Sequence, residues 1–126
     1  MQTNTMRIVM IGLPVMLIEI LAAAFVNDAN VVVSRIDDTL EHTQPENYKD
    51  CNLIITSMDT DRLVTSVGRN ILARNPELLI LNLADNGKTG DLIGFSIVRR
   101  SLGEIFPDKI LQAVRAGIAS FGQPLH

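Results

Sequence analysis

The sequence predicts an α/β fold, a three-layer α/β/α sandwich built on a doubly wound, mainly parallel sheet of five strands. Short, almost continuous apolar runs alternate with segments of helical spacing, which is typical of a parallel sheet covered on both faces. The chain has 126 residues, 47% of them apolar. That length suits one domain, because two domains would each be too small for a good core. We therefore expect residues 1–126 to form a single domain.

The first apolar stretch, residues 8–26, predicts a strand followed by a helix. Residues 6–11 are rich in β-branched side chains, and Pro14 suits the first turn of a helix over 15–26. A signal peptide or a short membrane span has a similar composition. Glu19 in the middle of the stretch and the break at Pro14 favour the strand and helix of a cytoplasmic protein.

Further strands are predicted from aliphatic runs, over residues 30–36, 52–57 and 77–83. The turn cluster DNGKTGD (85–91) follows the last of these. Residues 92–98, LIGFSIV, are ambiguous: the β-branched residues favour a strand, whereas helical spacing of the apolar residues is the alternative. If 92–98 is a strand, it lies too close in sequence to 77–83 for a crossover helix, and the two form an antiparallel hairpin.

Two more helices complete the predicted fold. The first spans 59–74, with Asp59 and Asp61 as candidate N-caps, and Asn75-Pro76 stops it. The second spans 107–119, and its apolar face consists of Ile110, Leu111, Val114 and Ile118. We expect Leu111 to be buried, so that its replacement by alanine would cost roughly 2–5 kcal/mol. The polar residues 37–50 leave room only for a short helix or an irregular loop.

Several chemistries lack their motifs. Gly12-Leu13-Pro14 after the first strand is not a dinucleotide-binding loop, and Gly87-Lys88-Thr89 is only the tail of a phosphate-binding loop, so a hairpin turn is the better interpretation. The single cysteine, Cys51, excludes an intramolecular disulfide and multi-cysteine metal sites. We therefore predict no bound cofactor and no metal.

Acidic residues gather where the predicted strands end. They are Asp37 and Asp38, Asp59 and Asp61, and Asp85. The carboxyl ends of parallel strands share one edge, where such folds bind ligands. Carboxylate oxygens suit Mg²⁺, so this edge is a candidate for weak binding. The alternative, which we favour, is that these residues cap helices and line solvated loops.

Two stretches resemble the receiver domain of bacterial response regulators. RIVMIGLPVMLIEIL (7–21) is similar to the opening strand and helix of that family, and FPDKILQAVRAGI (106–118) is similar to its closing helix. The resemblance implies a flavodoxin-like fold with strand order 2-1-3-4-5. It also implies phosphoryl transfer to an aspartate after strand three, with Mg²⁺ held by an acidic pair after strand one.

The chain departs from that family at every mapped site position. Gly12 and Leu13 take the place of the acidic pair, and Ser57 takes the place of the acceptor aspartate. Asn82 stands where the family has a hydroxyl, and Arg99 or Arg100 stands near the position of the family's lysine. In a second alignment, Asn82 falls at the position of the acceptor aspartate. A hydroxyl or an amide cannot form the acyl phosphate, so the resemblance implies a degenerate receiver.

We therefore expect a phosphorylation-independent regulatory domain that is not an enzyme and acts through protein contacts. The alternatives are a small flavodoxin-like enzyme or ligand binder using the acidic edge, and a structural subunit of an oligomer. The helix over 14–26 is apolar around most of its circumference, which predicts a homodimer through it or through the hairpin at 84–98. Another regulatory protein is the further expected partner. The single basic doublet and the few aromatic residues argue against nucleic-acid binding.

Overall fold

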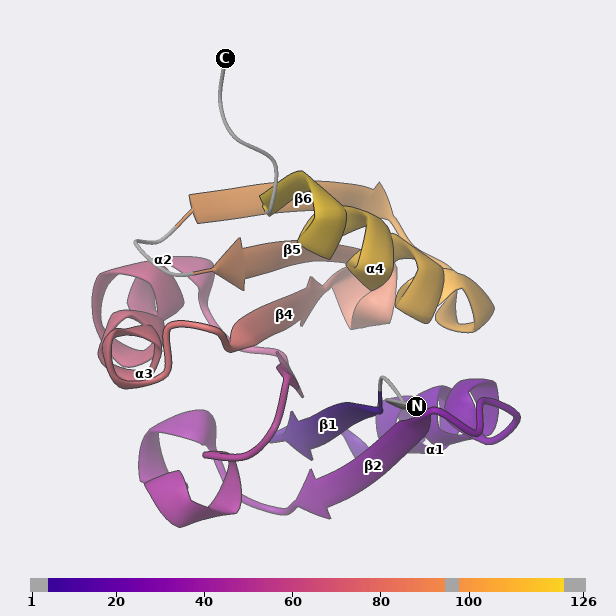
Figure 1. Cartoon of the computed structure of the whole chain (residues 1–126), viewed down its shortest axis with the longest axis horizontal. Helices are drawn as coiled ribbons and strands as arrows, with labels where there is room; N and C mark the ends of the chain where they lie inside the picture. The colour runs from indigo at the N-terminus through magenta and orange to yellow at the C-terminus, as the bar shows by residue number, and fades with distance from the viewer. Residues whose placement is uncertain (1–4, 95–97, 122–126) are drawn as a thin grey trace.

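A six-stranded mixed sheet forms the centre of the protein (Figure 1). The computed structural model describes residues 5–94 and 98–121. The sheet order is β2-β1-β3-β4-β5-β6. The strands are β1 (Met6–Ile11), β2 (Val31–Ile36), β3 (Leu53–Thr56), β4 (Leu79–Ala84), β5 (Thr89–Gly94) and β6 (Val98–Glu104). The first four are mutually parallel, whereas β5 is antiparallel to β4 and β6 is antiparallel to β5.

The α/β class and the antiparallel β4–β5 hairpin are confirmed, but a five-stranded, mainly parallel sheet is wrong. The turn is confined to residues 85–88, so β5 begins at Thr89 instead of at residue 92. Residues 95–97 of the predicted strand lie outside the described residues. The sixth strand was not predicted, because its sequence VRRSLGE is polar and contains Gly103. That glycine has a φ of +66° beside a register shift in the β5–β6 pairing, and a bulge of this kind interrupts the alternation that marks a strand.

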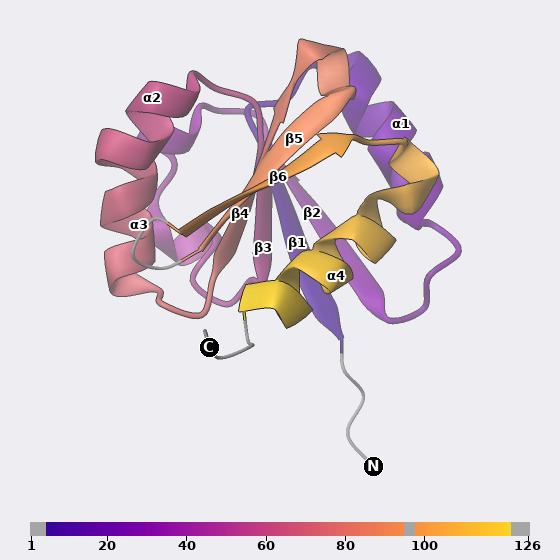
Figure 2. The same cartoon turned by 90° about the horizontal axis from the view of Figure 1, so that it is seen from above.

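Helices cover both faces of the sheet (Figure 2). On one face lie α1 (Val15–Phe25) and α4 (Ile110–Phe121), the latter preceded by the 3₁₀ turn η6 (Pro107–Lys109). On the other face lie the 3₁₀ turns η1 (Leu40–His42) and η2 (Pro45–Asn47), and one helical stretch. That stretch consists of α2 (Thr60–Arg62), a π-helical turn η3 (Leu63–Val67) and α3 (Gly68–Arg74). A further 3₁₀ turn, η4 (Asp85–Gly87), joins β4 to β5.

The π turn explains the glycine within the predicted 59–74 helix. A Cβ atom on Gly68 would lie 2.6 Å from the backbone oxygen of Leu63, so a larger residue does not fit this wide turn. Asp59 caps the start of the stretch by accepting a hydrogen bond from the backbone N–H of Arg62 at 3.1 Å. The N-cap prediction for Asp59 is therefore confirmed.

Alternation along the central strands divides the core into two halves. On β1, Ile8 and Met10 pack with α1 and α4, whereas Val9 and Ile11 pack with the helical stretch on the opposite face. Because β1, β3 and β4 have layers on both faces, their side chains are apolar nearly without interruption. This packing fixes the strand ends, and therefore the loops that form the candidate site.

Helix α1 has one buried and one exposed apolar side. Leu17, Leu21 and Phe25 are buried against the sheet, whereas Met16 is 73% and Ile20 is 45% exposed. Only one of the two apolar sides of this helix therefore faces the sheet. Within the described residues, no helix is long and apolar enough to cross a membrane.

Candidate functional site at the carboxyl edge of the parallel strands

The candidate site lies where β1 and β3 end side by side. The loop after β1 leads to α1 on one face of the sheet, and the loop after β3 leads to α2 on the other. This divergence is the topological switch point, at which open α/β sheets bind ligands. Gly12, Leu13 and Ser57 occupy the two loops, and the aspartates after β2, β3 and β4 lie along the same edge.

Asn82, near the end of β4, is the central polar residue of this edge. Its side chain is 2% exposed. The Oδ1 atom accepts a hydrogen bond from the backbone N–H of Met58 at 2.9 Å, and Nδ2 donates to the Met58 carbonyl at 3.0 Å and to Thr60 Oγ1 at 3.4 Å. The amide therefore pairs with both polar groups of one residue, as a neighbouring strand would, and holds the loop after β3 against β4.

Ser57 has a similar structural role. Its Oγ donates a hydrogen bond of 2.8 Å to the carbonyl of Leu83, so the hydroxyl ties the end of β3 to β4. Ser57 and Asn82 are therefore both used in internal hydrogen bonds, and neither is a carboxylate.

Gly12 and Leu13 fill the other side of the switch point. Gly12 has a φ of +68°, and a Cβ atom there would lie 3.0 Å from the backbone oxygen of Asp38. Leu13 is buried in the core cluster shared with α1. This side of the switch point is therefore formed by a close backbone approach and a buried apolar side chain, with no carboxylate at either position.

The structure assigns local partners to three of the five aspartates. Asp37 pairs with Arg35 at 3.1 Å, Asp38 accepts from the backbone N–H of Thr39 at 2.7 Å, and Asp59 caps α2. Asp61 is exposed in the first turn of α2, and Asp85 has a φ of +52° in the β4–β5 turn. In residues 5–94 and 98–121, no three His, Cys, Asp or Glu side chains group closely enough to hold a metal ion.

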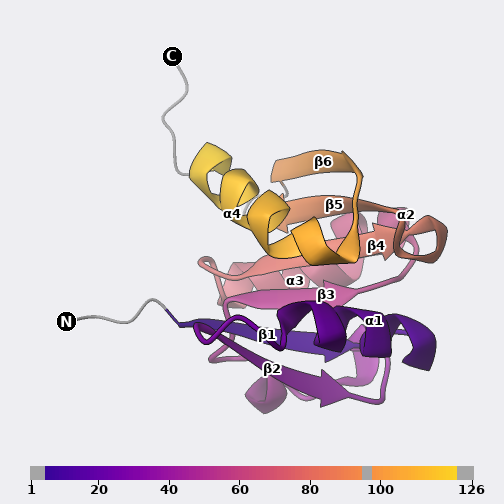
Figure 3. The ribbon, with the colours of Figure 1, turned by 90° about the vertical axis from the view of Figure 1, so that its right-hand side faces the viewer.

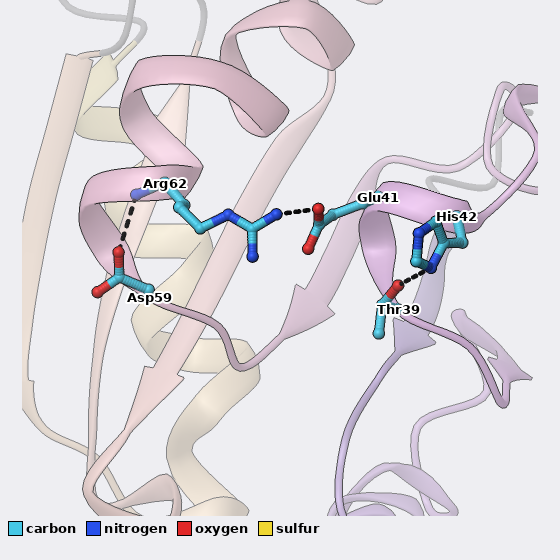
Figure 4. A network of polar contacts seen from close by, with 5 residues as sticks. All are labelled: Thr39, Glu41, His42, Asp59 and Arg62. Atoms are coloured by element: carbon cyan, nitrogen blue, oxygen red, sulfur yellow. Dashed lines mark hydrogen bonds and ion pairs between the residues drawn. The ribbon is translucent and has the colours of Figure 1, made fainter.

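An ion pair between Arg62 and Glu41 crosses this edge and was not predicted. It joins α2 to η1, which follow different strands, and beside it Thr39 and His42 hydrogen-bond at 2.9 Å (Figure 4). The two charged residues are 21 positions apart, so no helical or strand spacing relates them. Both are partly exposed, and the pair therefore adds little stability of its own.

Arg99 does not lie at this edge. It is near the start of β6 and pairs with Ile93, which in turn lies beside Ile80 close to the start of β4. Strand β5 runs opposite to β4, and β6 runs opposite to β5. Strand β6 therefore begins at the amino-terminal edge of the parallel strands, and the backbone of Arg99 lies there. The structure therefore separates this position from Ser57 and Asn82.

Cys51 is also at the amino-terminal edge, directly before β3. It borders an open hollow of about 410 Å³ together with residues that precede β4. Burial raises the pKa of the thiol to about 11, so it is protonated at neutral pH and a weak nucleophile. Cys51 is therefore a half-buried, protonated thiol at this edge.

Comparisons of the chain with family models, curated proteins and solved structures find no match. At the carboxyl edge, hydrogen bonds of Ser57 and Asn82 hold the loops in place, and Asp59 caps α2. The buried polar groups of this edge are satisfied within the chain, and its buried apolar groups close the switch point. These hydrogen bonds position the loops after β3 and β4 relative to each other.

Proposed function

We propose that the protein is a receiver-like regulatory domain of the cytoplasm that works without phosphorylation, through contacts with other protein surfaces. The observation that carries the proposal is the outer face of α1, which is apolar and exposed. The only charged residue in this helix is Glu19, whereas a helix on the outside of a sheet normally presents a polar face to water. Exposed apolar surface of this kind marks protein interfaces.

The independence from phosphorylation is supported by the residues at the switch point. A receiver forms an acyl phosphate on a carboxylate while a metal neutralises the incoming charge. Here Ser57 and Asn82 hold loops together, and Gly12 and Leu13 stand where the metal-binding acids would be. The proposed domain therefore has the architecture of a receiver, and its contact surface is present at all times without phosphorylation.

Incubation with acetyl phosphate and Mg²⁺ tests this proposal. We expect intact-protein mass spectrometry to show no phosphoryl adduct, because no residue at the switch point forms an acyl phosphate. Ser57→Ala is the matched variant, and it should behave as the natural chain does. A base-labile adduct that appears on the natural chain at this edge would contradict the proposal.

An NMR titration with Mg²⁺ and beryllofluoride separates the proposal from the ligand-binding alternative. A receiver-like domain without the acidic pair should show only small, non-saturating shifts around Asp59 and Asp85. Saturable shifts confined to the loops after β1, β3 and β4 would instead support a ligand site there.

A further inference from the structure

We propose that a second copy of this chain covers α1, in an antiparallel pairing about a two-fold axis at Ile20. The contact is the outer stripe of α1, defined as Met16, Ile20 and Ala24. This inference rests on the proposed function, namely that the domain acts through protein contacts, and it names the partner and the geometry.

The stripe is a continuous line on one side of the helix. Its members are four residues apart, a spacing that places side chains above one another on a helix. Met16 is 73% exposed, Ile20 is 45% exposed and Ala24 is half-buried. The stripe therefore changes from a projecting side chain at the start of α1 to a small, recessed one near its end.

A groove adjoins the recessed end. Helices α1 and α4 lie on the same face of the sheet (Figure 3). The groove that they border has a volume of about 470 Å³, and its lining combines Ala24, Ala29 and Leu111 with the polar residues Asn27, Asp28, Gln112 and Arg115. Its polar rim includes the ion pair of Arg115 with Asp28, at 3.3 Å. An unbranched methionine side chain can adapt to the apolar part of this lining, formed by Ala24, Ala29 and Leu111.

The projecting and recessed ends match under a two-fold axis. Met16 and Ala24 are equally far from Ile20 along the helix, on opposite sides of it. Antiparallel pairing at Ile20 therefore brings Met16 of each copy to Ala24 and the groove of the other. An isologous interface requires this kind of self-complementary surface, and small residues at a helix contact allow close approach.

Charge also favours a second copy over other occupants. The stripe has no charged member, and Glu19, which is exposed on a neighbouring line of the helix, lies at the rim of the contact and not within it. An anionic membrane would favour basic residues around the apolar face, and α1 contains none. A strongly charged protein partner would likewise find no opposite charge on the stripe.

Cysteine cross-linking tests the geometry, in a Cys51→Ser background that removes the natural thiol. Ile20→Cys should form a disulfide-linked dimer on mild oxidation, because the two-fold axis brings this residue close to itself. Val26→Cys is the matched control; Val26 lies just beyond the same helix, is 75% exposed and is off the stripe. Mixing Met16→Cys with Ala24→Cys chains should give a mixed dimer.

Light scattering across a concentration series tests the interface in solution. We expect a dimer for the natural chain, and roughly a tenfold or greater weakening for Met16→Glu, because the carboxylate would be buried without a partner. Val26→Glu should leave the dimer intact. Met16 is exposed in the single chain, so circular dichroism should show both variants folded.

Three results would overturn the inference. They are a monomer at high micromolar concentration, a dimer that survives Met16→Glu, and a dimer that cross-links through Val26→Cys but not Ile20→Cys. The proposed function fails by a different observation, the phosphoryl adduct, so the two failures are distinguishable. A monomer whose α1 face binds vesicles or a different protein would identify another occupant of the stripe.

Discussion

Asn82 shows how one side chain can replace a whole length of strand pairing. Strand β3 ends at Thr56, so the backbone N–H and carbonyl of Met58 lie beyond its last ladder contact. The carboxamide is the side chain that presents both a donor and an acceptor to them. An ionised aspartate at this position would offer only acceptors, and one of its oxygens would face the carbonyl oxygen of Met58, which is also an acceptor.

We expect Asn82→Ala to lower the free energy of unfolding by roughly 1–3 kcal/mol, because it leaves both polar groups of Met58 without a partner in a partly buried loop. Chemical denaturation measures the loss. Asn70→Ala is the control, because Asn70 is exposed on α3 and should change the stability by less than about 0.5 kcal/mol. Equal losses in the two variants would show that the amide does not brace the loop.

The sequence identifies Asn82 as a polar residue of this edge, but it does not predict the hydrogen bonds of Asn82 to Met58. Asn82 is one of the mapped positions, yet its partner Met58 lies 24 residues earlier, and nothing in the local sequence pattern relates the two. The same holds for Arg62 and Glu41. Contacts between loops depend on strand register, which a single sequence with short apolar runs does not specify.

At the scale of elements, apolar periodicity predicted the buried strands and the helices well. Strands β1, β3 and β4 are enclosed on both faces, so burial alone selects their residues. Strand β6 lies at an edge of the sheet and contains a bulge, which removes both signals. The boundary of β5 was missed because glycines that usually mark a turn, such as Gly90, lie within it; there a Cβ atom would lie 2.7 Å from Ile105 Cδ1.

Helix α4 corrects one expectation about packing. Ile110 and Val114 are fully buried, whereas Leu111 is only half-buried beside the groove. The helix is rotated relative to the expected face, so that Ile110 and not Leu111 points into the core. The loss of stability expected from replacing a fully buried residue of this helix by alanine therefore applies to Ile110 and not to Leu111.

We expect Ile110→Ala to destabilise the fold by roughly 2–5 kcal/mol, and Leu111→Ala to cost clearly less. Thermal or urea unfolding measures both, with Gln112→Ala as the exposed control. If Leu111→Ala proved the more damaging of the two under conditions in which the chain is monomeric, the orientation of α4 would be wrong.

At the scale of the whole molecule, the mixed sheet divides the chain into two unlike halves. In the parallel half, each new strand requires a crossover, as over residues 12–30 between β1 and β2. In the other half, β4, β5 and β6 are joined by residues 85–88 and 95–97 alone. The two halves therefore differ in their connections, since β4 and β5 have no crossover helix between them.

This division also sets an order of events for a chain that starts unfolded. Closing a short loop costs less entropy than closing a long one, and local contacts speed folding. The β4–β6 meander should therefore assemble before the parallel strands join it.

Stopped-flow measurements would then show Leu92→Ala mainly slowing folding and Ile8→Ala mainly speeding unfolding. The reverse result would place the folding nucleus around β1. On this account the slowest step of folding is the docking of the amino-terminal parallel strands onto a β4–β6 meander that has already formed.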